Sequence, residues 1–172
     1  MITAYIGIGA NLGDRAKTLC SAAAELGKRE EIRLIAASPV YETAPVGVAD
    51  QPDFLNAVLQ VETDLPGRAL LDLLLEVERA FGRVRNRKWE ARTLDLDVLL
   101  YGGAVIREEG LEVPHPHLHT RAFVLLPLCD LNADGCHPVL GRTFRDLARS
   151  ICAEQRVQRV EGISLLPACR RG

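Results

Sequence analysis

The chain has 172 residues, of which 48% are hydrophobic and 26% are charged, and its formal net charge is -2. These values are typical of one soluble globular domain and give no bulk electrostatic signal for nucleic acid or membrane binding. No apolar run approaches the ~18 residues that a transmembrane helix needs. The first residues also lack the basic region of a signal peptide. We therefore expect residues 1–172 to form a single cytoplasmic domain.

The five cysteines are widely spaced along the chain and include no Cys-x-x-Cys pair. Their odd number and their spacing disfavour a disulfide framework. Free cysteines are typical of a reducing compartment, which agrees with a cytoplasmic location.

The first third of the chain predicts a strand, a helix and a second strand. Residues 2–9 show a loose alternation, which favours a strand. Asp14 is a candidate N-cap for a helix over residues 15–28 that ends near Gly27. Residues 32–42 predict another strand, in which Pro39 indicates an edge or a bulge.

The middle of the chain repeats this order after a long loop over residues 43–53. Residues 54–62 alternate again and predict a strand. A helix is expected from the Asp64-Leu65-Pro66 start to Gly82, because leucines recur at helical spacing between these two boundaries.

The remaining segments begin with a basic loop over residues 83–92 and the clearest strand, over residues 93–101. A second loop is expected over residues 107–120. Two short helices are expected after it, over residues 121–131 and 143–152, and the tail from about 150 to 172 is weakly patterned.

The element order through residue 101 is β-α-β-β-α-β. This order predicts an α+β fold, a ferredoxin-like sandwich in which two helices pack on one face of an antiparallel sheet. The extra C-terminal helices would follow this core. The other face of the sheet would remain partly open and leave room for a functional site.

Two acidic residues, Asp95 and Asp97, lie in the most apolar strand of the chain. Because side chains alternate along a strand, Leu94, Leu96 and Val98 would face the helices, and the two carboxylates would share the open face roughly 7 Å apart. Aspartate is disfavoured in strands, and Mg²⁺ binds one or two carboxylates together with phosphate oxygens. The pair therefore suits a metal–nucleotide site, and an amphipathic strand with a solvated polar face is the alternative.

Five cations precede this strand around Trp89, and they are Arg83, Arg85, Arg87, Lys88 and Arg92. Arginine matches phosphate oxygens and stabilises charge during phosphoryl transfer. The segment therefore predicts a lid over a triphosphate. A solvated basic turn and an RNA-binding patch are the alternatives, and the neighbouring carboxylates count against RNA.

Histidines recur at positions 115, 117 and 119, and Arg121 follows them. On an extended segment the three imidazoles would share a face and bind Zn²⁺. Phosphate contacts from His115 and Arg121 are the better functional interpretation, and an ordinary surface loop is the alternative. Phe54 and Asn56 are two residues apart, so they would share one face of their strand.

Together these segments resemble the 6-hydroxymethyl-7,8-dihydropterin pyrophosphokinases of folate biosynthesis. The resemblance covers residues 5 to about 128, and its segments occur in the order typical of the family. The matching segments are 5–14, 41–45, 51–57, Glu78, 82–85, Trp89, 92–97, 113–116 and 121–125. The most specific one is Arg-Thr-Leu-Asp-Leu-Asp at 92–97, followed downstream by Pro114-His115.

The resemblance implies a role for each matching residue. Asp95 and Asp97 would hold two Mg²⁺ ions on ATP, and Arg83 and Arg92 would assist the transfer. The other ATP-binding residues would be Glu78, Arg85, Trp89, His115 and Arg121. The pterin-binding residues would be Thr43, Ala44, Val46, Phe54, Asn56 and Phe123, with the two phenylalanines on either side of the ring.

Two positions depart from the family pattern. Position 54 is Phe where some members carry Tyr, so stacking on the pterin is retained without a phenol contact. Position 117 is His where many relatives have Arg, so one phosphate contact of those relatives is not matched.

The implied reaction is attack by the pterin hydroxymethyl oxygen on the β-phosphorus of ATP, with AMP as the leaving group. ATP and 6-hydroxymethyl-7,8-dihydropterin would be the partners, without nucleic acid or membrane, and we expect a monomer. Two rival functions are a magnesium nucleotidyltransferase that uses the same carboxylates and a ferredoxin-like RNA-binding module that uses the basic loop.

Overall fold

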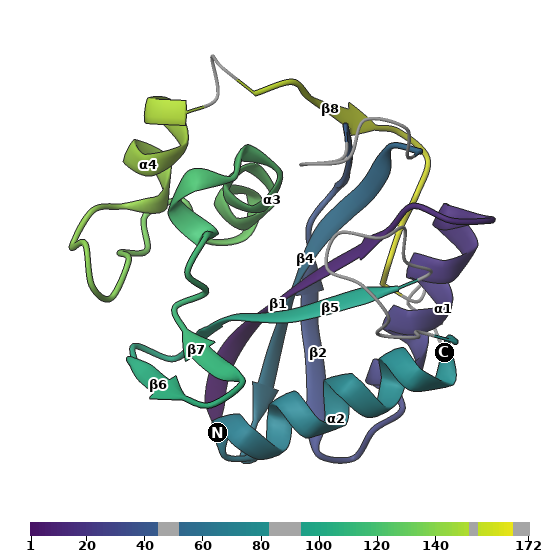
Figure 1. Ribbon diagram of the computed structural model, residues 1–172, viewed down its shortest axis with the longest axis horizontal. Helices are drawn as coiled ribbons and strands as arrows, with labels where there is room; N and C mark the ends of the chain where they lie inside the picture. Colours follow the sequence, from purple (N-terminus) through teal and green to yellow (C-terminus); the bar gives the residue numbers. More distant parts are fainter. Residues whose placement is uncertain (45–51, 83–93, 152–154, 167–172) are drawn as a thin grey trace, which may run out of the picture.

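The computed structural model describes residues 1–44, 52–82, 94–151 and 155–166. The strands of its central antiparallel sheet are β1 (Ile2–Ala10), β2 (Ile32–Ala37), β3 (Val40–Thr43), β4 (Phe54–Thr63), β5 (Asp95–Tyr101) and β8 (Val157–Val160). They follow the order β5-β1-β4-β3-β8, and β2 also pairs with β4 (Figure 1). The fold is thus a mixed α/β fold built on an antiparallel sheet.

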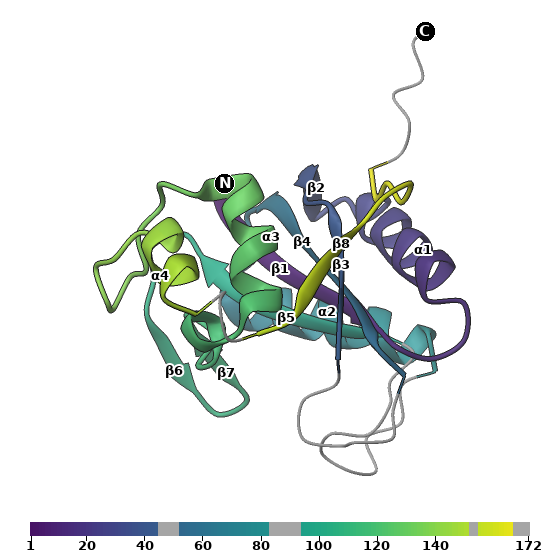
Figure 2. The same cartoon turned by 90° about the horizontal axis from the view of Figure 1, so that it is seen from above.

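Helices cover both faces of this sheet. The α-helices are α1 (Arg15–Gly27), α2 (Gly67–Ala80), α3 (Ala122–Asn132) and α4 (Phe144–Ile151), and a 3₁₀ turn, η1 (Leu118–Thr120), precedes α3. Figure 2 shows α1 and α3 with strands of the sheet between them. No helix in the described ranges has the length and apolar character needed to cross a membrane.

The alternation of side chains along β1 separates two hydrophobic cores. Ala4, Ile6 and Ile8 lie in the core that α1 and α2 cover. Tyr5 belongs to the second core, which contains side chains of α3 and α4. A sheet with an apolar core on each face must bury both sets of alternating residues, so its open part is confined to positions that α3 and α4 leave uncovered.

The segment expected as one strand over residues 32–42 is divided into β2 and β3. Pro39 has no backbone N–H to contribute to the ladder. At the break, the Ser38 backbone N–H donates to the Val58 carbonyl at 2.9 Å, and the Ser38 hydroxyl accepts from the Val58 N–H at 2.9 Å. The Ser38 side chain thus replaces part of the interrupted ladder, and both strands stay paired with β4.

Two short β elements lie where the sequence predicted none. The expected loop over residues 107–120 begins with part of a hairpin formed by β6 (Ile106–Glu108) and β7 (Leu111–Val113). The weakly patterned tail contributes β8, which pairs with β3 at the edge of the main sheet. Each element spans three or four residues, which is too short for a clear alternation pattern.

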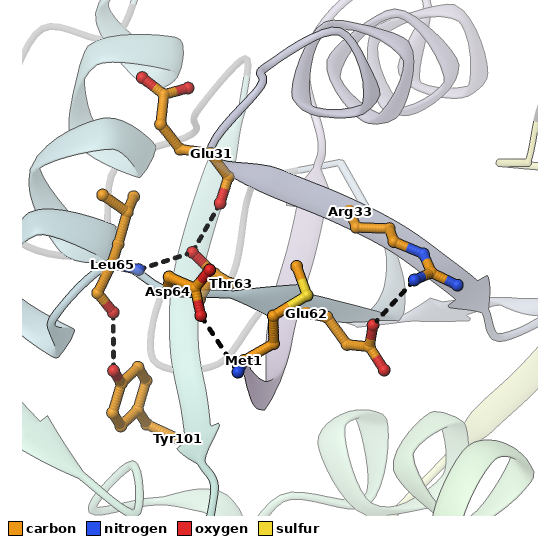
Figure 3. Close-up of polar contacts among 8 residues, drawn as sticks. All are labelled: Met1, Glu31, Arg33, Glu62, Thr63, Asp64, Leu65 and Tyr101. Carbon is orange, nitrogen blue, oxygen red and sulfur yellow. Dashed lines mark hydrogen bonds and ion pairs between the residues drawn. The ribbon is translucent and has the colours of Figure 1, made fainter.

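Partly buried polar contacts secure the end of the sheet where β1 begins and β4 and β5 end (Figure 3). The Thr63 hydroxyl donates to the Glu31 carbonyl at 2.7 Å and accepts from the Leu65 N–H at 3.1 Å. The Tyr101 hydroxyl donates to the Leu65 carbonyl at 2.6 Å. Two of these three contacts join segments that are distant in the sequence. The described site candidates on β3, β4 and β5 lie toward the opposite end of the sheet.

Candidate active site

The two aspartates lie on the face of β5 that points away from α1 and α2. Leu96 and Val98, which alternate with them, are buried in the core beneath those helices, as the sequence predicted. Asp95 and Asp97 are half-buried. Their cross-strand partners on β1 are two glycines, at positions 9 and 7 respectively.

With glycine at these two positions, β1 places no side chain of its own on the sheet face between β5 and β4, and side chains of the neighbouring strands can lie over it. Gly9 pairs with Asp95 on one side and with Asn56 on the other. A Cβ atom added to Gly9 would lie 2.6 Å from the Asn56 Oδ1, so a side chain there would displace the Asn56 carboxamide. No role was predicted for Gly9 itself, although a glycine inside an apolar strand is a signal of close approach between backbone and a neighbouring group.

Residues from β3 and β4 extend this face. The Asn56 Nδ2 donates to the Thr43 Oγ1 at 3.2 Å. Thr43 is buried, and it pairs across the strands with Phe54, which is half-buried. Ala44 follows Thr43 and is exposed. Four of the six expected pterin residues thus lie together at the ends of two paired strands.

A bulge in β5 places His115 beside the aspartates. The register between β1 and β5 shifts by one residue, and Leu99 is the extra residue of β5. The Leu99 carbonyl accepts the His115 N–H at 3.0 Å. The His115 Nδ1 in turn accepts the His117 N–H at 3.1 Å, so the ring is held as an acceptor on that side.

Burial lowers the pKa of His115 from its ordinary value of 6.5 to about 4, with Arg121 and His117 acting in the same direction and Asp95 opposing them. The imidazole is therefore neutral near pH 7. With Nδ1 accepting a hydrogen bond, its proton resides on Nε2, and His115 can donate one hydrogen bond into the site.

This shift predicts a pH dependence of stability in the metal-free protein. Between pH 6.5 and about 4 the unfolded chain binds a proton at His115 that the native state does not. The free energy of unfolding therefore falls as the pH falls through this window, and His115 has no such effect above pH 6.5. The free energy of unfolding can be measured by urea denaturation at several pH values from 7.5 to 4. It should decrease less steeply with falling pH in His115→Gln than in the wild type, and an equal decrease in both proteins would contradict the pKa shift.

Arg121 and Phe123 mark the start of α3, over the face that carries the aspartates. Burial lowers the pKa of the Arg121 guanidinium, and the carboxylates of Asp97 and Asp95 act in the opposite direction because they are close to it. The guanidinium carbon lies 5.6 Å from the centre of the Phe123 ring, which is half-buried. The site thus combines two carboxylates, a neutral imidazole and a guanidinium.

Glu78 reaches the same strand from the opposite side of the sheet. It lies on α2 with only 1% of its surface exposed, and its carboxylate accepts the Leu96 N–H at 2.7 Å. Leu96 lies between Asp95 and Asp97 on β5, which is the edge strand of the described sheet. This contact fixes the strand that carries both aspartates.

The three histidines do not share one face, which contradicts the premise of a Zn²⁺ site. The His115 and His117 rings lie 6.0 Å apart, whereas His119 packs edge-on against His137, with their centroids 5.7 Å apart. Within the described part of the chain, no three metal-binding side chains of the His, Cys, Asp or Glu type cluster together.

Five residues expected in the site lie outside the described residues. They are Val46, Arg83, Arg85, Trp89 and Arg92. Cys20 and Cys136, two of the five cysteines, lie in the described part of the chain and are free thiols.

The chain matches the family model described as 7,8-dihydro-6-hydroxymethylpterin-pyrophosphokinase over residues 5–133. It is 44% identical over 134 residues to the 2-amino-4-hydroxy-6-hydroxymethyldihydropteridine pyrophosphokinase of Haemophilus influenzae, covering 78% of this chain and 84% of that protein. It is 40% identical over 158 residues to the enzyme of the same name from Pseudomonas aeruginosa, covering 92% of this chain and 96% of that protein. The chain therefore belongs to the 7,8-dihydro-6-hydroxymethylpterin-pyrophosphokinase family.

Solved structures support the same fold. An HPPK-DHPS protein in complex with substrates has a TM-score of 0.70 and 15% identity, covering 87% of this chain and 43% of that chain. Wild-type HPPK-DHPS of Plasmodium falciparum has a TM-score of 0.70 and 16% identity, covering 87% of this chain and 41% of that chain. The chain thus spans less than half the length of these solved chains, and the likeness concerns its fold alone.

Proposed function

We propose that the protein transfers the pyrophosphoryl group of ATP to the hydroxymethyl oxygen of 6-hydroxymethyl-7,8-dihydropterin, giving the pterin diphosphate and AMP in folate biosynthesis. Membership of the pyrophosphokinase family supports this reaction. The observation that carries it in this chain is the placement of Asp95 and Asp97 on the sheet face that Arg121 and His115 also approach.

Asp95 and Asp97 are the residues that would hold two Mg²⁺ ions on ATP. Their carboxylates suit this hard cation because they supply oxygen ligands, are half-buried and share one face of the sheet. They also lie close to the Arg121 guanidinium, whose hydrogen-bond donors match phosphate oxygens. Bound Mg²⁺ would neutralise the polyphosphate and polarise the phosphorus under attack. Glu78 would act on this pair indirectly, because it contacts the backbone between them.

The ATP phosphates would be bound by residues at the start of α3 and in the segment that precedes this helix. Arg121 would donate its forked hydrogen bonds to phosphate oxygens, and neutral His115 would donate one more from Nε2. Arg85 and Trp89 would complete the nucleotide site, and Arg83 and Arg92 would stabilise the charge that develops during the transfer. Their predicted roles come from the sequence and its resemblance to the family.

The pterin would lie at the ends of β3 and β4. Phe54 and Phe123 would stack on its two faces, because each ring is half-buried and they come from β4 and α3, which pack together. Asn56 and Thr43 would hydrogen-bond to the edge of the heterocycle, together with backbone groups of residues 44 and 46. The hydrogen bond between the Asn56 and Thr43 side chains orients the carboxamide for this task.

In the proposed step, the alcohol oxygen forms a bond to the β-phosphorus of ATP. The bond from that phosphorus to the oxygen bridging the α- and β-phosphates breaks, and AMP leaves with this oxygen. The hydroxyl proton passes to water, since no described side chain stands out as a general base. Catalysis would therefore rest on positioning and charge neutralisation.

A ferredoxin-like core is part of the same proposal. The order β5-β1-β4-β2, with α1 and α2 on one face, supports a ferredoxin-like core. A single domain and a cytoplasmic monomer are expectations from the sequence.

Phosphorus NMR of a reaction containing ATP, Mg²⁺ and 6-hydroxymethyl-7,8-dihydropterin tests the proposed function. The expected products are AMP and a pterin diphosphate. Free pyrophosphate with an adenylylated pterin would instead indicate a nucleotidyltransferase. Unchanged ATP, together with salt-dependent RNA binding in the absence of Mg²⁺, would favour the RNA-binding module.

A further inference from the structure

The segment after α4 touches both sides of the candidate site. Its strand, β8, pairs with β3 so that Val157 lies opposite Thr43 and Arg159 lies opposite Tyr41. Two residues before β8, the side chain of Gln155 reaches the start of α3. A single stretch of six residues, 155–160, therefore contacts the strand that carries Thr43 and the helix that begins beside Arg121.

Gln155 binds the backbone on both sides of Arg121. Its Oε1 accepts the Ala122 N–H at 2.8 Å, and its Nε2 donates to the Thr120 carbonyl at 2.8 Å. Arg121 is the N-cap residue of α3, and its own side chain makes no capping hydrogen bond. Gln155 therefore supplies from a distant segment an acceptor that a local cap would ordinarily provide.

A second contact joins α3 to the strand on which β8 rests. The Tyr41 hydroxyl donates to the carboxylate of Asp130, and burial raises the pKa of Tyr41, so the phenol stays protonated. The start of α3 is thus fixed by Gln155, and its later turns are fixed by Tyr41. The position of the Arg121 and Phe123 side chains depends on how α3 is placed against the sheet.

We infer that Gln155 is a positioning residue of the active site, which orients Arg121 for the triphosphate by holding the peptide groups before and after it. The inference rests on the proposed function, and it assigns a role to a segment that the resemblance to the family leaves unassigned. A guanidinium that must meet phosphate oxygens with two parallel hydrogen bonds tolerates little rotation of its backbone.

The test replaces Gln155 by methionine, which keeps the length of the side chain and removes both hydrogen bonds. Gln158→Met is the matched control, because Gln158 lies on β8 in the same segment and its side chain is exposed. The expected result is a loss of kcat/KM for ATP of roughly 10- to 100-fold in Gln155→Met. The KM for the pterin should change less than the KM for ATP, because Phe123 lies within α3 and Tyr41 still holds the later turns of that helix. Gln158→Met should retain wild-type kinetics.

A double-mutant cycle separates positioning from general destabilisation. If Gln155 acts through Arg121, Gln155→Met should have almost no further effect on kcat/KM in an Arg121→Ala background. A merely structural role would lower the activity by the same factor in both backgrounds. Equal factors, or kinetics of Gln155→Met within twofold of the wild type, would overturn the inference.

Amide hydrogen exchange tests the clamp without requiring turnover. The Ala122 N–H should exchange faster in Gln155→Met than in the wild type, and it should be unaffected in Gln158→Met. An unchanged exchange rate would overturn the clamp itself. A wild-type protein that forms no AMP would instead refute the proposed function, so the two failures are distinguishable.

Discussion

Replacing Asp97 by asparagine is expected to lower kcat by roughly 10²–10³-fold or more, the range in which single electrostatic contacts to a transition state fall. The substitution keeps the size of the side chain and one acceptor oxygen, and it removes the charge that would hold Mg²⁺ against the polyphosphate. Asp97 is half-buried and lies outside both hydrophobic cores, so the fold should tolerate the change. Initial rates of AMP formation measure the effect, and isothermal titration with Mn²⁺ and an ATP analogue measures the loss of metal binding.

Asp64→Asn is the matched control for this prediction. The Asp64 carboxylate is 80% exposed and lies 3.1 Å from the N-terminal amine, at the end of the sheet away from the candidate site. A surface ion pair contributes little to stability, so this variant should behave as the wild type does. An Asp97→Asn enzyme that keeps near-wild-type activity at saturating Mg²⁺ would show that this carboxylate does not anchor the metal.

Replacing Gly9 by alanine is expected to impair pterin binding while the protein stays folded. The added Cβ would lie 2.6 Å from the Asn56 Oδ1, and the end of this side chain can rotate away without moving the backbone. The rotation would break the hydrogen bond to Thr43 and turn the carboxamide from the heterocycle. Loss of such polar recognition costs about 1–3 kcal/mol, so the pterin Kd should rise roughly 5- to 150-fold at an unchanged ATP affinity.

Gly7→Ala provides the comparison, because Gly7 lies on the same strand face two residues away. The nearest atoms to its added Cβ would belong to the Leu99 side chain, at 3.4 Å and beyond, which is ordinary van der Waals contact. The pterin affinity should therefore fall much less than in Gly9→Ala. If Gly9→Ala raised the Kd equally in the wild type and in an Asn56→Ala background, its effect would not pass through Asn56.

The location of the aspartates followed from the sequence because it depends on local alternation. Leu94, Leu96 and Val98 are apolar and must be buried, so the residues between them face the other side of the sheet. The N-cap at Asp14 was predicted in the same way, and its carboxylate accepts the Lys17 N–H at 3.1 Å. Strand faces and helix caps can be predicted in this way because each depends only on the residues within one element.

Other features of the site depend on contacts between distant segments, so no local sequence pattern predicts them. The bulge at Leu99 arises where β5 must pair with β1 and also carry side chains into the core under α3. The burial of Glu78 depends on how α2 lies against an edge strand, so the sequence could not show that its carboxylate binds a backbone amide. Gln155 is a polar residue in a weakly patterned tail, and only its placement reveals the two hydrogen bonds to the start of α3.

The proposed chemistry depends on Asp95 and Asp97, which together would hold the metal ions that accompany ATP. Anomalous diffraction from crystals grown with Mn²⁺, a non-hydrolysable ATP analogue and the pterin would locate these ions. We expect two Mn²⁺ peaks within coordination distance of these carboxylates, with Arg121 against the phosphates. Peaks bound to other residues, or a triphosphate on the α1 and α2 side of the sheet, would contradict this expectation.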